Sequence, residues 1–209
     1  MNSLFESLFA PYGGYSLWDI AAEALAVITG LMSVWYARQE NILVYPVGLI
    51  STGLYVYICL HFGLYGESGI NAYYTAVSIY GWWNWARPSA SAALPISRNT
   101  PKEQLLSIVL LVVFSLVLWG VLDRFTDSNV PLADGITTAI FCVAMWLMAR
   151  KKLESWLYWI AGDLLAPPLY FYKGLTLTAF QYVIFLLLAV MGWMEWKKRL
   201  NENPTVSPE

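Results

Sequence analysis

The segment LESWLYWIAGDLLAPPLYFYK, residues 153–173, decides the architecture because it is about one bilayer long and almost wholly apolar. Its single central carboxylate is Asp163, and on a helix Trp159 lies one turn earlier on the same face. A central Asp costs about 2.5–3.5 kcal/mol on membrane-insertion scales, so an acid at this depth indicates a functional site. The alternative is a structural acid that is hydrogen-bonded to a neighbouring helix. Pro167 and Pro168, which begin four residues beyond Asp163, are expected to interrupt the hydrogen-bond ladder of this helix and to kink it.

The composition is that of a polytopic membrane protein, with 58% hydrophobic and 12% charged residues among 209. The net charge of −2 leaves no basic surface that would suit nucleic acid. The sequence contains no cluster of metal ligands and no nucleophile–base pair. It therefore predicts no enzyme, no catalytic residue, no cofactor, no metal and no nucleic-acid partner. The expected partners are the lipid bilayer and a small molecule.

Apolar stretches predict seven transmembrane helices and no separate soluble domain. We expect an interfacial segment over residues 1–15, a three-helix bundle over 16–85 and a cytoplasmic loop over 86–102. A linker helix with its outer loop follows over 103–130, and then a second three-helix bundle over 131–196. The cytoplasmic tail is residues 197–209. The seven predicted spans are 16–37, 41–62, 67–85, 103–122, 131–149, 153–173 and 175–196.

If the chain has seven spans, its Lys and Arg residues are distributed very unequally between the two sides of the membrane. Ten of the 12 Lys and Arg residues then fall on one side, and only Arg124 and Lys173 fall on the other. The positive-inside rule predicts that the ten face the cytoplasm, with the N-terminus outside and the C-terminus inside. An even number of spans would mix the two sets.

The ends of the spans also indicate an internal repeat. Trp35 and Trp146 are 111 positions apart, and so are the motifs GWWNW and GWMEW. The motifs LYVY (54–57) and LYFY (169–172) are 115 positions apart, which predicts a small gap inside the repeating unit. Two three-helix units joined by one linker helix form a parallel repeat, which is a transporter architecture. The alternative is a duplicated scaffold without transport.

Polar and aromatic side chains inside the spans outline a candidate binding site. Glu23 and Asp163 are carboxylates, although Glu23 could instead reach the outer headgroups. The amides of Asn71 and Gln181 lie near the outer ends of related spans and can both donate and accept, either to a ligand or between helices. No Lys or Arg lies in the centre of a span. Acids beside aromatic rings suit a flat cation, with about 0.5–2 kcal/mol per cation–π contact, or a proton.

The segments YPVGLISTGLYVYICLHFGLYGESGINAYYTAVSIYGWWNW (45–85) and GDLLAPPLYFYKGLTLTAFQYVIFLLLAVMGWMEW (162–196) resemble the PnuC-type vitamin transporters. The resemblance implies an all-α integral membrane protein with seven transmembrane helices as 3+1+3 parallel repeats, similar to a full-length SWEET transporter. It also implies a homotrimer in the bacterial inner membrane, and passive uptake followed by trapping by a cytoplasmic vitamin kinase. The best-known substrate of the family is nicotinamide riboside, and relatives carry thiamine, riboflavin or deoxynucleosides.

Carried onto this chain, the resemblance and the charge pattern predict a substrate site with residues from several spans. The chain departs from nicotinamide riboside carriers at residues 69–74, which look closer to some thiamine-type relatives, and at Asp163, where other members have Asn. We therefore expect a nicotinamide riboside uniporter, with a thiamine transporter or a proton-coupled carrier as alternatives. The predicted substrate-binding residues are Glu23, Tyr45, Gly48, Asn71, Tyr74, Trp159, Asp163, Gln181 and Tyr182.

Overall fold

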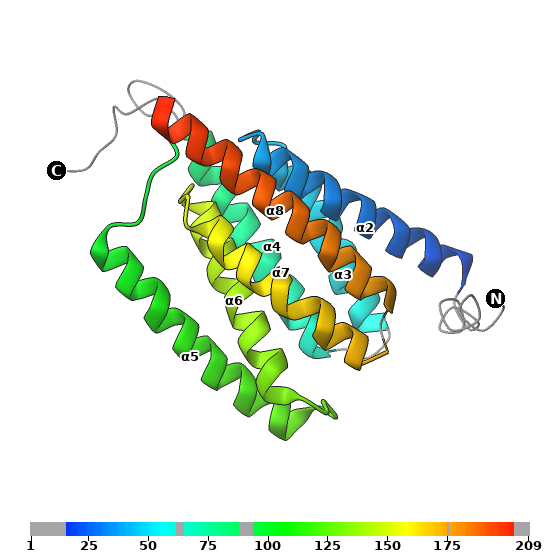
Figure 1. Cartoon of the computed structure of the whole chain (residues 1–209). Coiled ribbons are helices and arrows are strands. Elements are labelled where there is room, and N and C mark those ends of the chain that lie inside the picture. Colours follow the sequence, from blue (N-terminus) through cyan, green and yellow to red (C-terminus); the bar gives the residue numbers. More distant parts are fainter. Residues whose placement is uncertain (1–15, 62–64, 88–93, 175, 203–209) are drawn as a thin grey trace.

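The structure, a computed structural model, describes residues 16–61, 65–87, 94–174 and 176–202, and it forms seven helices over these ranges (Figure 1). All except α4 and α7 are long and apolar enough to cross a membrane. The predicted all-α, multi-pass class is thus confirmed, whereas the predicted interfacial segment 1–15 lies outside the described residues. The helices are α2 (Leu17–Arg38), α3 (Val44–His61), α4 (Tyr65–Ala86), α5 (Pro101–Phe125), α6 (Pro131–Ala149), α7 (Ser155–Tyr172) and α8 (Thr176–Glu202).

Capping boxes fix the starts of α2 and α5. The Ser16 hydroxyl accepts a hydrogen bond from the Asp19 N–H over 3.1 Å, and the Asp19 carboxylate accepts one from the Ser16 N–H over 3.2 Å. Thr100 and Glu103 form the same pair of bonds at the start of α5, with Pro101 as the first helical residue. The linker helix therefore begins at Pro101, two residues before the predicted start.

Helix α7 continues through Pro167 and Pro168 to Tyr172, in agreement with the predicted span 153–173. Each proline removes only its own N–H, and the carbonyls of Asp163 and Leu164 lose their usual helical donors. The flanking turns hold because α7 packs along its length between α6 and α8.

Helix α8 is longer than predicted and ends at Glu202 rather than near residue 196. Two ion pairs support its last turns, each between residues that lie one helical turn apart. They are Arg199–Glu195 at 3.0 Å and Lys198–Glu202 at 3.9 Å. The first residues of the predicted tail 197–209 are thus helical.

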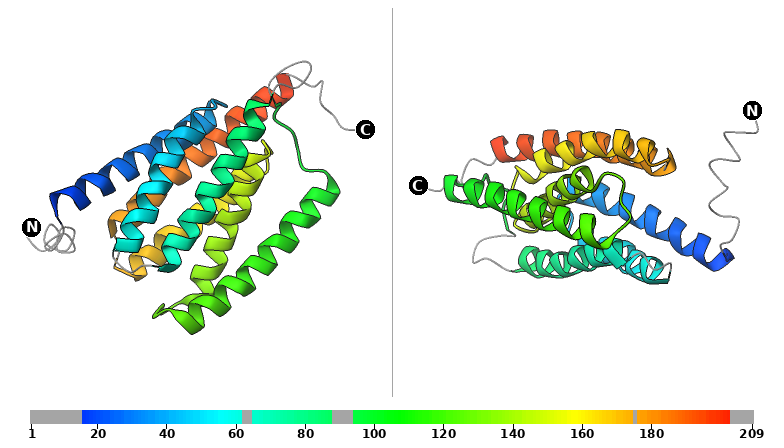
Figure 2. Two further views of the ribbon diagram at one scale, coloured as in Figure 1. Left: turned by 180° about the vertical axis from the view of Figure 1, so that it is seen from behind. Right: turned by 90° about the horizontal axis from the view of Figure 1, so that it is seen from below.

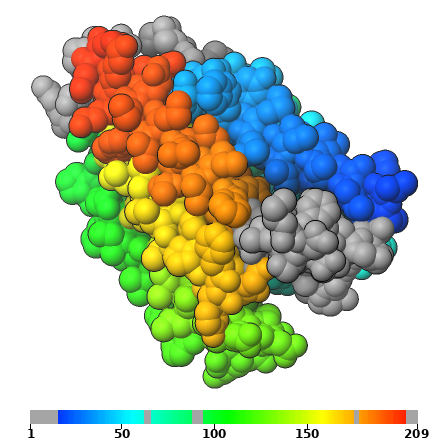
Figure 3. All heavy atoms as spheres, turned by 45° about the vertical axis from the view of Figure 1, so that its right-hand side comes forward, coloured from blue at the N-terminus to red at the C-terminus, as the bar shows by residue number. Residues whose placement is uncertain are grey.

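The helices pack as two groups of three. In the first group α2 packs on α3 and α3 on α4, and in the second group α6 packs on α7 and α7 on α8. Between the groups, α2 packs against α8 and α4 against α6, while the main neighbour of α5 is α6 at one flank (Figures 1 and 2). The space-filling view shows α8 and α2 side by side across one face (Figure 3).

An offset of 111 positions relates several helix ends of the first group to those of the second. Both ends of α3 match those of α7, the start of α4 matches that of α8, and the end of α2 matches that of α6. The predicted gap is therefore wrong. The tyrosine motifs misled because 54–57 lies inside α3 whereas 169–172 ends α7, and tyrosines recur near membrane interfaces regardless of ancestry.

The described part of the predicted loop 86–102 packs against the turn between α6 and α7. The Ser97 N–H donates to the carbonyl of Lys151 over 3.1 Å, and the Leu153 N–H donates to the carbonyl of Ser97 over 2.9 Å. Ile96 is buried beside them. We call this end of the bundle, where α2, α4, α6 and α8 end, the basic end because the predicted cytoplasmic Lys and Arg residues lie toward it.

Candidate functional site

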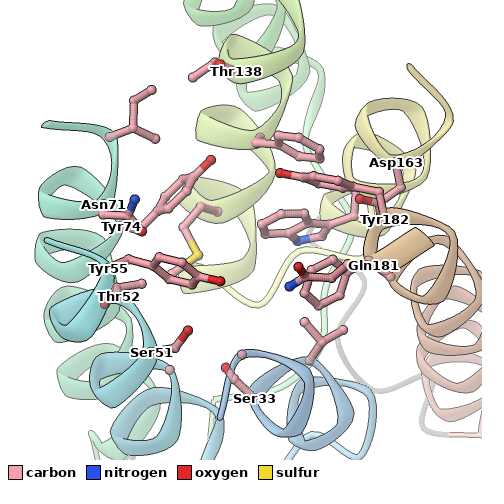
Figure 4. Close-up of a pocket in the computed structure, with 18 of the residues that line it drawn as sticks. Ser33, Ser51, Thr52, Tyr55, Asn71, Tyr74, Thr138, Asp163, Gln181 and Tyr182 are labelled. Atoms are coloured by element: carbon pink, nitrogen blue, oxygen red, sulfur yellow. The ribbon is translucent and has the colours of Figure 1, made fainter. Parts of the chain in front are cut away.

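A cavity of about 460 Å³ lies between the two helix groups, and every described helix except α5 contributes to its lining. Figure 4 shows Tyr55 and Tyr74 reaching into it from one side and Gln181 and Tyr182 from the other. All nine residues that we expected to bind substrate line this cavity, and their role in binding stays a prediction. They are Glu23, Tyr45, Gly48, Asn71, Tyr74, Trp159, Asp163, Gln181 and Tyr182.

Asp163 is 2% exposed and lies in the lining with Trp159, as their shared helix face predicts. Among the described residues it has no hydrogen-bond or ion-pair partner. A buried carboxylate without a partner is costly to keep charged. A positively charged group in the cavity would offset that cost.

The charges around the cavity are acidic. Glu67 and Asp134 join Glu23 and Asp163, and the described part of the lining contains no Lys, Arg or His. Asp134 is already neutralised, because Lys173 forms an ion pair with it at 2.5 Å. The remaining field favours a cation over an anion.

One wall of the cavity is a run of aromatic rings from the second helix group. Phe141 lies 5.6 Å from Trp159, and it is stacked 5.6 Å from Tyr182 at an interplanar angle of 15°. Tyr182 in turn is stacked on Tyr170 at 5.0 Å. Gly162 makes room for this wall, since a Cβ there would collide with the Phe141 ring. The rings offer faces on which a planar ligand can stack.

Where α2 and α3 meet, the lining of the cavity includes several small and polar residues. Ser33 of α2 donates its hydroxyl to a backbone carbonyl of α3, and Ser51 of α3 donates to one of α2, each over 2.8 Å. A Cβ at Gly48 would lie 2.8 Å from the Ser33 hydroxyl, and one at Gly30 would lie 3.1 Å from the Ser51 hydroxyl. The absence of a side chain at Gly48 therefore allows α3 to pack closely on α2.

Toward the basic end four buried rings pack together, and we call them the aromatic floor; they are Tyr45, Trp85, Trp156 and Trp196. Tyr45 and Trp156 also line the cavity. Tyr45 meets Trp85 edge-on at 5.2 Å and Trp156 meets Trp196 edge-on at 5.5 Å. The Trp85 indole donates to the carbonyl of residue 148 over 3.2 Å, and the Trp196 indole donates to that of residue 37 over 3.0 Å. Each bond joins one helix group to the other.

An ion-pair cluster lies directly beyond the aromatic floor. Lys151, 3% exposed, pairs with Glu40 at 2.5 Å and lies 4.6 Å from the Trp85 ring. Arg199 reaches the second oxygen of Glu40 at 3.2 Å. Burial lowers the pKa of Lys151 below its ordinary value, although the Glu40 carboxylate opposes this shift. Glu40 and Lys151, themselves 111 positions apart, have positive φ angles of 62° and 57°.

Sequence reasoning missed several lining residues, and the 111-position offset could have found some of them from residues that were predicted. Thr52 corresponds to Asp163, Asp134 to Glu23 and Trp156 to Tyr45. By the same offset, the counterpart of Asn71 is Tyr182. Other missed residues, which have no predicted counterpart, are Gly30, Ser33, Ser51, Tyr55, Glu67, Phe141 and Tyr170.

The family described as nicotinamide mononucleotide transporter matches residues 20–198. The chain belongs to this family. The resemblance to PnuC-type proteins is thereby confirmed, and membership of a transporter family agrees with the prediction that the chain is not an enzyme.

Relatives of known function cover nearly the same length. The nicotinamide riboside transporter PnuC of Escherichia coli is 27% identical over 91% of this chain and 90% of its own. The nicotinamide riboside transporter PnuC of Neisseria mucosa is 30% identical over 86% of this chain and 73% of its own. The riboflavin/roseoflavin transporter RibM of Streptomyces davaonensis is 26% identical over 99% of this chain and 98% of its own. Among solved structures, the vitamin B3 transporter PnuC superposes with a TM-score of 0.68 and 26% identity, covering 91% of this chain and 94% of that one.

Proposed function

We propose that this chain carries a planar, positively charged vitamin precursor across the membrane by facilitated diffusion, and that nicotinamide riboside is its substrate. The observation that carries the proposal is the acidic aromatic cavity, whose described lining has no Lys, Arg or His. A pyridinium ring on Trp159 and Phe141 would bring its positive charge near Asp163, gaining stacking and charge attraction together.

The same cavity argues against a phosphorylated substrate. Phosphate groups in proteins are held by Arg, Lys or clusters of N–H donors. Here the nearest charged groups in the described lining are carboxylates. We therefore infer that the dephosphorylated nucleoside, and not the mononucleotide, is carried.

We infer a 3+1+3 parallel repeat, similar to a full-length SWEET transporter, with α5 as the linker. The offset of 111 positions and the reciprocal contacts of α2 with α8 and α4 with α6 support it. In such a repeat the substrate path runs between the two groups, and rocking of one group against the other would expose each end in turn.

The distribution of basic residues supports a cytoplasmic basic end, with the N-terminus outside and the C-terminus in the cytoplasm. Three further parts of the proposal come from the family resemblance. They are a homotrimer, a bacterial inner-membrane location and trapping of the product by a cytoplasmic vitamin kinase.

Transport by purified protein in lipid vesicles tests this proposal, because vesicles contain no kinase. Labelled nicotinamide riboside should enter until its inner and outer concentrations are equal, and an imposed pH gradient should leave that plateau unchanged. Accumulation driven by the gradient would replace the uniporter with a proton-coupled carrier. Entry of labelled thiamine in place of the riboside would select the thiamine alternative, and entry of neither would contradict the proposal.

A further inference from the structure

The two walls of the cavity have opposite chemistry at corresponding positions. Four rings of the second helix group have small counterparts 111 positions earlier, all of which also line the cavity. At these four positions the rings lie on α6–α8, and the smaller residues lie on α2–α4. The pairs are Phe141 with Gly30, Trp159 with Gly48, Tyr170 with Cys59 and Tyr182 with Asn71.

The lining where α2 and α3 meet offers hydrogen-bond acceptors. A hydroxyl has one hydrogen and two lone pairs, and Ser33 and Ser51 both donate their hydrogen to backbone carbonyls. Their oxygens thus remain only as acceptors where they line the cavity, as Figure 4 shows for both residues. Gly30 and Gly48 leave room for the two hydroxyl groups, because a Cβ at either position would lie too close to one of the oxygens.

We propose that Ser33 and Ser51 form a subsite for the polyhydroxylated part of the substrate. Their oxygens accept hydrogen bonds from sugar or sugar-alcohol hydroxyls while the ring stacks on Phe141, Trp159 and Tyr182. This inference rests on the proposed function and narrows its substrate class to a planar heteroaromatic ring that carries a ribosyl or ribityl group. Thiamine, with a single hydroxyethyl arm, would leave most of the subsite unused.

Acceptors that match substrate hydroxyls should discriminate strongly, because a ligand without those hydroxyls leaves the site's polar groups unpaired. Two matched ligand pairs measure this on the wild-type chain. Nicotinamide riboside and 1-methylnicotinamide share a cationic ring, and riboflavin and lumiflavin share a neutral one. The polyol member of whichever pair binds should bind at least tenfold more tightly than its ring-only partner in calorimetric titrations of purified protein.

The variants Ser51→Ala and Ser33→Ala should remove this preference selectively. We expect at least a fivefold loss of affinity for the polyol member and less than a twofold change for the ring-only member. Ser107→Ala is the matched control, since Ser107 is a fully buried serine on α5 that bonds Tyr158 away from the cavity. It should change neither affinity.

Three results would overturn the subsite. Equal losses for both members of a pair would mean that the serines only hold the helices together. Unchanged affinities in both variants would mean that no hydroxyl reaches them. Equal wild-type affinities within each pair would deny the subsite while leaving transport of the ring intact. Wild-type protein that binds none of the four ligands would instead contradict the proposed function.

Discussion

The aromatic floor and the middle of the cavity use corresponding positions in opposite ways. At the floor, Trp85 and Trp196 make the same two kinds of contact. Each indole donates a hydrogen bond to a backbone carbonyl of the other helix group, and each ring meets another ring edge-on. In the middle several partners differ in size or charge. In the proposed repeat, symmetry is thus kept where the two groups are held together and is lost at several positions where a ligand would bind. The floor pairs are Trp85 with Trp196 and Tyr45 with Trp156, and the diverged pairs are Gly48 with Trp159 and Thr52 with Asp163.

The largest effect should come from removing either indole of the floor. Trp85→Ala and Trp196→Ala each delete a buried ring and a bond between the groups, so each should lower the free energy of unfolding by about 3–5 kcal/mol. Their equivalence predicts values within about 1 kcal/mol of each other, measured by unfolding in detergent. Trp82→Ala, at a 41% exposed position of α4, is the control and should cost far less. Very unequal losses would break the symmetry claimed for the floor.

Glu40→Gln should come next, because it leaves the buried Lys151 without its carboxylate. Stranding a buried charge costs about 3–5 kcal/mol, and the partial exposure of Glu40 reduces this to about 2–4 kcal/mol. Adding Lys151→Met should recover part of the loss, since no charge is then stranded. A double variant as unstable as the sum of its singles would show that the pair is not coupled.

The pH dependence of Glu40→Gln should distinguish this cause from simple loss of packing. Burial already lowers the pKa of Lys151, and losing the carboxylate lowers it further. The folded state then binds fewer protons than the unfolded state, so the stability of the variant should rise with pH toward the ordinary Lys range. A flat profile relative to the wild-type chain would exclude a stranded lysine.

The helices and the lining could be predicted from the sequence because both leave local signals. Asp163 stands out as one charge in an apolar span, and amides or tyrosines inside spans are similarly rare. Phe141 and Ser51 give no such signal, since apolar and hydroxyl residues are ordinary in membrane helices. Their importance depends on which helix lies opposite.

The cluster at the basic end could not be predicted from local patterns. Glu40 and Lys151 are far apart in the chain, and both lie in short turns where charged residues are normal. Only the packing of α2 against α8 and α4 against α6 brings them together. The tyrosine motifs 54–57 and 169–172 caused the opposite error. Their sequences are similar, but the two motifs occupy different positions in α3 and α7.

Glycines beside the floor provide a smaller test of its packing. A Cβ at Gly192 would lie 2.5 Å from the Trp156 ring, and one at Gly81 would collide with Tyr45. Overpacking predicts a loss of about 1–3 kcal/mol for Gly192→Ala and Gly81→Ala. Gly120→Ala on α5, where no atom lies within 4 Å, should be neutral or slightly stabilising. Thermal unfolding in detergent compares the three, and a neutral Gly192→Ala would mean that the floor is loosely packed.

The smallest effect in free energy should come from Asp163→Asn, which removes a charge from the diverged middle and keeps its shape. A cationic ligand such as nicotinamide riboside should bind about tenfold more weakly, a change of about 1.4 kcal/mol. Neutral riboflavin should lose little, and the unfolding midpoint should hardly change because no described residue bonds the carboxylate. Thr52→Val, the corresponding change in the first helix group, should not separate cations from neutral ligands. If Asp163→Asn weakened both ligands equally, the carboxylate would act through hydrogen bonds or local structure, and charge would no longer explain why this side of the cavity diverged.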